Sequence, residues 1–134
     1  LPASQFAVDA EVSFVGSRSL LEAIASSLTE IYAPAIHAER ISGLSKHYEW
    51  ADDYALAYFK KRIGQARKDV EFGREWVIDN ALTRDDQDAV LGAVRFKTEV
   101  LWAQLDALYY AYVDPGFIPP GAFVPNGFAE RAWS

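Results

Sequence analysis

Two short stretches of the sequence place polar side chains at helical spacing, where they can act together. In "HAER", His37 and Arg40 are three residues apart, so both side chains project toward nearly the same side of a helix. In "YALAYFKKR", Tyr54, Tyr58 and Arg62 follow one another at intervals of four residues and share one face. The imidazole can accept or donate a proton, while the phenols and guanidinium groups donate hydrogen bonds. Such a set suits proton transfer and the binding of an aromatic polyanion.

Lys97 is the third candidate, because it interrupts an apolar helical stripe. The stripe recurs at spacings of three and four and consists of Val90, Val94, Lys97, Leu101, Leu105 and Leu108. A lysine on such a face either extends its ammonium group to water or needs a paired anion. We expect the anion to be a ligand carboxylate or, failing that, an internal acid such as Glu30 or Asp69.

The same patterns also have structural explanations. A histidine beside an arginine on an amphipathic helix is more often a hydrogen-bonded surface pair than a catalyst. Two tyrosines and an arginine at helical spacing commonly pack on a neighbour while the arginine head reaches water. The spacing alone leaves both interpretations open.

Composition excludes several classes of function. The chain has 134 residues, the size of one domain, and a formal net charge of −6, which argues against broad nucleic-acid binding. It has no cysteine, so disulfides, thiolate metal sites and a cysteine nucleophile are excluded. It has two histidines, and the residues three before them are Pro34 and Leu44, so it lacks the Glu-x-x-His pairs of helical di-iron proteins. We therefore expect no metal site.

No apolar run approaches the roughly twenty residues that span a bilayer, so we expect no membrane association and a cytoplasmic location. The chain begins "LPASQFAVDA" and contains no methionine. We expect it to be a fragment or a processed piece of a longer protein.

The segments that carry the candidate site residues are predicted to be helices. Residues 4–16 fit a helix better than a strand, and Ser19 with Glu22 forms a capping box for a helix over residues 19–32. Pro34 suits the first turn of a helix over residues 34–48. Further helices are predicted over residues 52–65, where Gly64 ends or bends the helix, over residues 66–82, and from a cap at Thr83 and Asp86 to about Val113. The predicted fold is an all-α, up-and-down helical bundle in residues 1–113.

Residues 114–134 differ from the rest in composition. They hold four of the six prolines and three glycines, so we predict an irregular Pro/Gly-rich arm or linker.

At "FAVDA", "SLTEIYAPAIHAER", "YFKKR", "RKDVEFG" and "FKTEVLWAQLDALYYAY" the sequence resembles the PqqC family of pyrroloquinoline-quinone synthases, in the TenA-like, haem-oxygenase-like helical group. The resemblance covers residues 1 to about 113 and matches only the C-terminal half of that enzyme. It implies a haem-oxygenase-like bundle that acts in the last step of pyrroloquinoline quinone (PQQ) biosynthesis. In that step a cofactor-free oxidase closes a ring of a bicyclic, amino-acid-derived precursor and oxidises it with O2, releasing H2O2.

The resemblance also implies roles for individual residues. The histidine and arginine of the family's H-x-x-R stretch fall on His37 and Arg40, its Y-x-x-x-R stretch on Tyr58 and Arg62, and its late-helix lysine on Lys97. We predict that His37, Tyr58 and Arg62 are catalytic. We predict that Arg40 and Lys97, together with Tyr54 one turn before Tyr58, bind substrate.

Two departures from the family pattern lead to the rival interpretation. Glu11 stands where the family is expected to have a tyrosine, and the front half of the enzyme, with further substrate contacts, has no counterpart. We therefore expect the chain to be incomplete as an enzyme on its own. The alternative is a helical interaction module of the same fold without catalysis. A thiaminase-like relative would need the cysteine nucleophile that this chain lacks.

The implied partners are the polyanionic quinone precursor or PQQ, O2 and a second copy of the chain. A PqqD domain, fused after the tail or separate, is a further expected partner.

Overall fold

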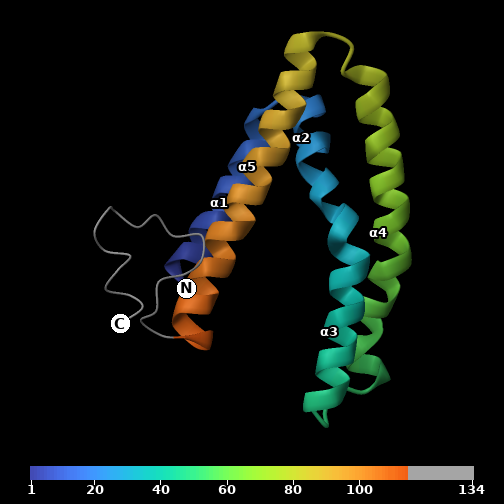
Figure 1. Cartoon of the computed structure of the whole chain (residues 1–134), viewed down its shortest axis with the longest axis vertical. Helices are drawn as coiled ribbons and strands as arrows, with labels where there is room; N and C mark the ends of the chain where they lie inside the picture. The colour runs from blue at the N-terminus through green and yellow to red at the C-terminus, as the bar shows by residue number, and fades with distance from the viewer. Residues whose placement is uncertain (115–134) are drawn as a thin grey trace, which may run out of the picture. The chain divides into compact units, whose positions relative to one another are not determined.

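The computed structural model describes residues 1–114, and every regular element in that range is helical (Figure 1). The prediction of an all-α fold is therefore confirmed. The predicted arm or linker over residues 114–134 lies, apart from Asp114, outside the described residues. The described residues divide into two compact units, one of Leu1–Arg18 with residues 95–114 and one of Ser19–Val94.

The second unit contains four elements in full, namely α2 (Leu20–Ser26), the 3-10 helix η1 (Ser27–Tyr32), α3 (Ala33–His47) and α4 (Asp53–Asn80). The first part of α5 (Arg84–Leu108) also belongs to it. Helix α4 packs against α2, η1 and α3, and Figure 1 shows α3 and α4 side by side.

The helices α2, α3 and α4 each begin at residues that favour the start of a helix. Ser19 and Glu22 form the predicted capping box of α2, and Pro34 lies in the first turn of α3. The Asp52 carboxylate accepts a hydrogen bond from the backbone N–H of Ala55 and caps α4. The 3-10 helix η1 interrupts the single helix that was predicted over residues 19–32.

The buried core of the second unit is made of small and medium side chains. It includes Ala25, Ala33, Leu56, Ala66 and Val77. Small residues at these positions let α2, η1 and α3 approach α4 closely.

The predicted end of a helix at Gly64, and with it the division into two helices, is wrong, because α4 is one helix over Asp53–Asn80. Glycine inside a helix costs about 1 kcal/mol relative to alanine. Burial of Leu56, Ala66 and Val77 along the same helix offsets a cost of that size. Tertiary packing therefore decided the length of this helix.

The first unit consists of α1 (Pro2–Ser17), the part of α5 from Arg95, and the π-helical segment η2 (Tyr109–Val113). The helical interpretation of residues 4–16 is confirmed and the strand alternative is wrong. The Phe14 and Phe96 rings stack with centroids 4.2 Å apart, joining α1 to α5. The last helix extends, with η2, to the predicted Val113.

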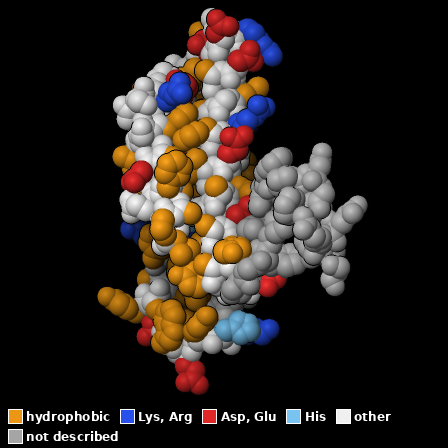
Figure 2. Space-filling view, turned by 90° about the vertical axis from the view of Figure 1, so that its left-hand side faces the viewer, with side chains coloured by type: hydrophobic (Ala, Val, Ile, Leu, Met, Phe, Trp, Pro, Cys, Tyr) orange, Lys and Arg blue, Asp and Glu red, His pale blue; other side chains and the backbone are white. Residues whose placement is uncertain are grey.

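Many large hydrophobic side chains remain exposed in the described part of the chain. Examples are Phe6, Val12, Phe72 and Trp102, each more than half exposed. Figure 2 shows hydrophobic side chains spread along much of the face that it presents. Among the described residues, no helix is both long enough and apolar enough to cross a membrane.

The cap of α5 gives a testable pH dependence. The Thr83 hydroxyl and then the Thr83 backbone N–H donate to Asp86 and hold its pKa below the ordinary 3.8. Because the folded-state pKa is lowered, the cap stabilises α5 above the unfolded pKa and is lost as pH falls through the folded value. We expect an NMR titration of the Asp86 carboxyl to give a midpoint below 3.8 that Thr83→Ala moves upward. An unchanged midpoint in Thr83→Ala would contradict this assignment.

Candidate active-site residues

His37 is the buried centre of the candidate site. It lies on α3 and is 7% exposed. Its ring meets the Tyr58 ring edge-on at 6.3 Å and the Phe59 ring at 5.6 Å between centroids, both from α4. Its Nδ1 atom is buried and has no hydrogen-bond partner in the described part of the chain. Buried polar atoms are nearly always satisfied, so this nitrogen is a site for a proton or a ligand group.

Arg40 lies one turn after His37 on α3 and is exposed. Its guanidinium carbon lies 5.9 Å from the centroid of the Phe59 ring, a cation–π distance. Within residues 1–114 no acid is within ion-pair distance of Arg40, so its charge is available to an anionic ligand. The structure thus brings His37, Arg40 and Tyr58 together around Phe59.

Arg62 is in a different electrostatic situation. Its guanidinium group donates to Glu30 on η1 at 3.0 Å and to Asp69 on α4 at 3.5 Å. The Arg62 side chain is only 28% exposed. Its charge is therefore already compensated within the second unit, where it links η1 to α4.

Tyr54 does not join the cluster in this structure. Its side chain is 92% exposed and forms no ring contact or hydrogen bond with any other described residue. Tyr58 is 63% exposed but packs against both His37 and Phe59. The two tyrosines share the predicted helix, and only Tyr58 reaches the histidine.

Lys97 belongs to the first unit, whereas the other five predicted site residues belong to the second. Its ammonium group pairs with Glu11 of α1, and both side chains are 21% exposed. The expectation that Glu30 or Asp69 would serve as its internal acid is wrong, because those acids bind Arg62. Glu11 and Lys97 are 86 residues apart in the sequence. Helical spacing relates only residues within a few turns, so it could not predict that they pair.

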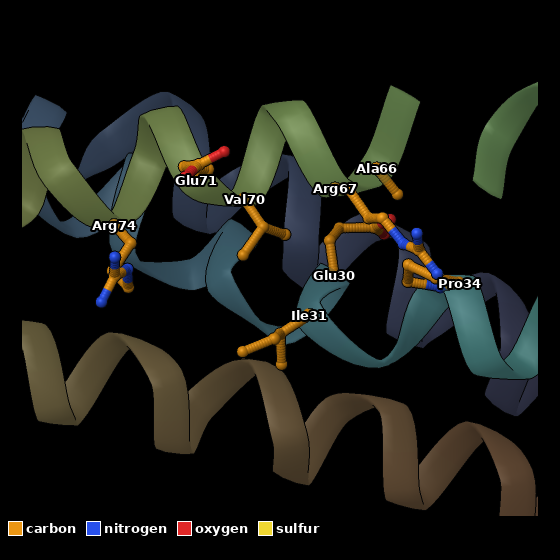
Figure 3. A pocket seen from close by; sticks show the side chains of 8 residues that line it. All are labelled: Glu30, Ile31, Pro34, Ala66, Arg67, Val70, Glu71 and Arg74. Atoms are coloured by element: carbon orange, nitrogen blue, oxygen red, sulfur yellow. The ribbon is translucent and has the colours of Figure 1, made fainter. Parts of the chain in front are cut away.

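A pocket of about 260 Å³ opens where η1 and α3 meet α4 (Figure 3). Arg67 and Arg74 from α4 line it together with Glu30 from η1 and Pro34 from α3. Figure 3 shows the Arg67 side chain reaching toward Glu30 and Pro34. None of the six predicted site residues lines this pocket.

Sequence reasoning missed Phe59, whose ring contacts the His37 ring and lies under the Arg40 guanidinium group. It named Glu30, Asp69 and Glu11 but missed their partners, because Glu30 and Asp69 pair with Arg62 and Glu11 pairs with Lys97. Asp69 had a usable signal, because it lies two helical turns after Arg62. In the part of the chain that the structure describes, no group of three or more His, Asp or Glu side chains is placed to hold a metal ion.

The arrangement around His37 suits proton transfer next to a bound anion. A buried imidazole whose Nδ1 atom has no partner can accept or donate a proton, and the adjacent phenol of Tyr58 can donate a hydrogen bond. Arg40 supplies a positive charge at the edge of the same cluster.

Residues 1–107 match the TENA/THI-4/PQQC family. Among curated relatives, the pyrroloquinoline-quinone synthase of Rhizobium meliloti is 63% identical over 123 residues, 92% of this chain and 48% of that protein. The pyrroloquinoline-quinone synthase of Granulibacter bethesdensis is 56% identical over 94% of this chain and 49% of that protein. The enzyme of the same name from Rhodopseudomonas palustris is 56% identical over 96% of this chain and 50% of its own length.

The chain thus spans about half the length of the curated relatives that it matches. The resemblance read from the sequence motifs is confirmed by these matches. With four-fifths of its residues matched in order, the chain belongs to the TENA/THI-4/PQQC family.

Proposed function

We propose that this chain acts in the last step of PQQ biosynthesis, as part of an oxidoreductase that closes a ring of a bicyclic, amino-acid-derived precursor and oxidises it with O2. The observation that carries this proposal is the set of relatives named pyrroloquinoline-quinone synthase, which are 54–63% identical over 92–96% of the chain. The His37 cluster supports it, because the reaction needs a proton acceptor beside an anionic aromatic substrate.

In this proposal His37 and Tyr58 are catalytic. His37 removes a proton from the substrate, and the Tyr58 phenol donates a hydrogen bond to a quinone oxygen or to reduced oxygen. Each two-electron oxidation takes two electrons and two protons from the substrate and converts one O2 to one H2O2. No redox cofactor is required by that balance, and we propose that none takes part.

The cations have distinct proposed roles. Arg40 binds a substrate carboxylate, since it is the cation at the His37 cluster that no described acid neutralises. Arg62 is proposed to be a catalytic residue of the same site, with its guanidinium group paired to Glu30 and Asp69. Pre-organised positive charge of this kind stabilises the electron-rich, enolate-like forms of the substrate that react with O2. Tyr54, as an exposed phenol one turn from Tyr58, is proposed to contact bound substrate.

A titration of PQQ into the chain, followed by the quinone absorbance, tests this proposal. We expect saturable binding that Arg40→Gln weakens about tenfold, because a charge-assisted hydrogen bond contributes roughly 1.5–3 kcal/mol. Arg84→Gln is the matched control, since Arg84 is a surface arginine paired with Asp88. Equal binding by both variants, or no binding by the unchanged chain, would contradict the proposed role of Arg40.

The alternative of a non-catalytic interaction module is not favoured by the similarity to the synthases. Oxygen uptake separates the two. An enzyme consumes O2 and releases H2O2 when given the precursor, whereas a module binds the quinone without consuming O2.

We also propose that two copies of the chain associate through exposed apolar side chains such as Phe6 and Trp102. We expect light scattering to give the mass of a dimer. A monomer whose mass stays constant with rising concentration would contradict this proposal.

We propose a cytoplasmic location, which cell fractionation tests.

We also propose that the chain associates with a PqqD-type domain, which is either fused to it or separate. Calorimetric titration of the chain with a separate PqqD-type domain tests this association, and the absence of heat at micromolar concentrations would contradict it.

A further inference from the structure

The pocket of about 260 Å³ between η1, α3 and α4 lies wholly within the second unit, because every residue that lines it belongs to that unit. Ile31, Pro34 and Val70 give the pocket an apolar part, and Arg67 and Arg74 give it positive charge. None of the residues with a proposed catalytic or substrate-binding role lines it. The pocket is therefore a candidate site for a different ligand.

The two arginines lie toward opposite ends of this pocket. They are seven residues apart on α4, which places them on one face of the helix and about 10 Å apart along its axis. Figure 3 shows their side chains toward the two ends, with Ile31 and Val70 between them. A molecule that fills the pocket therefore meets a guanidinium group at each end and apolar side chains in the middle.

Neither guanidinium group has an acid partner in the described part of the chain. Both arginine side chains are exposed, and no acid among residues 1–114 lies within ion-pair distance of either. Of the two acids that line the pocket, Glu30 already accepts a hydrogen bond at 3.0 Å from Arg62. Glu71 lies between the two arginines in the sequence and pairs with neither. Two unpaired cations thus stand against one unpaired carboxylate.

We propose that this pocket binds a small dicarboxylate whose two carboxylates are joined by an apolar spacer such as an aromatic ring. The planar guanidinium group of an arginine matches a carboxylate and donates two parallel hydrogen bonds to it. Arg67 binds one carboxylate and Arg74 the other, while the spacer packs against Ile31 and Val70. This binding site goes beyond the proposed function and does not depend on it.

Two isomeric probes test this arrangement. Terephthalate carries its carboxylates at opposite ends of a benzene ring, whereas phthalate carries the same two groups on adjacent carbons. The probes have equal charge and composition, and they differ in whether one molecule reaches both arginines. Their affinities for the full chain are measured by ligand-observed NMR at neutral pH and low ionic strength, where exposed charges are little screened.

We expect the unchanged chain to bind terephthalate about fivefold more tightly than phthalate. Arg67→Gln and Arg74→Gln should each weaken terephthalate binding by about fivefold, a modest factor because both side chains are exposed. Lys68→Gln is the matched control, since Lys68 is an exposed cation of the same helix that does not line the pocket. Glu71→Gln should strengthen binding, because it removes the unpaired carboxylate from the pocket.

All four substituted side chains are exposed, so these variants should fold like the unchanged chain. Equal weakening by Lys68→Gln and by the two arginine variants would reduce the effect to the general charge of α4 and would overturn the proposal. Equal affinity of the unchanged chain for terephthalate and phthalate would also overturn it, and so would the absence of terephthalate binding.

Discussion

Replacing Lys97 by methionine is expected to lower the free energy of unfolding by about 2 kcal/mol, which is less than the 3–5 kcal/mol for a fully buried pair because some water reaches it. The substitution keeps the length and apolar stem of the side chain but leaves Glu11 with a largely buried, unpaired charge. Urea unfolding followed by circular dichroism measures the effect.

The cause is separated from general packing by a double-mutant cycle. Glu11→Leu/Lys97→Met replaces both charges with apolar groups and should recover most of the stability lost in Lys97→Met. Lys60→Met, which breaks an exposed pair with Asp53, should change stability little. If the double variant is less stable than Lys97→Met, the pair is not the source of the effect.

Replacing His37 by leucine, in the oxidoreductase of which this chain is proposed to be a part, is expected to lower the rate of precursor oxidation by about 10²–10⁴, the usual contribution of a positioned acid–base group. Leucine preserves apolar contact with Tyr58 and Phe59 but removes the open Nδ1 atom. Oxygen uptake and H2O2 release under single-turnover conditions measure the rate, and PQQ titration measures binding separately.

His47→Leu is the matched control, because His47 is the other histidine of the chain and lies exposed at the end of α3. It should leave the rate unchanged. A His37→Leu variant that binds PQQ normally and oxidises the precursor at the original rate would remove His37 from the proposed chemistry. Weakened binding with an unchanged rate at saturation would make it a binding residue only.

The local features of this protein were determined by sequence alone. The capping box at Ser19 and Glu22, the cap at Thr83 and Asp86, and the position of Pro34 each depend on residues within one turn. Helical spacing also put His37 and Arg40 on neighbouring positions of one helix face. These signals are local because a helix satisfies its backbone hydrogen bonds over four residues.

The electrostatic state of the candidate residues was decided by tertiary structure. Whether Lys97 is available to a ligand depends on Glu11, which is 86 residues away, and the state of Arg62 depends on Glu30, which is 32 residues away. His37 became buried because α4 supplies the Tyr58 and Phe59 rings. Helical periodicity fixes which side of its own helix a residue occupies, but only the packing of helices determines which acid or ring stands opposite it.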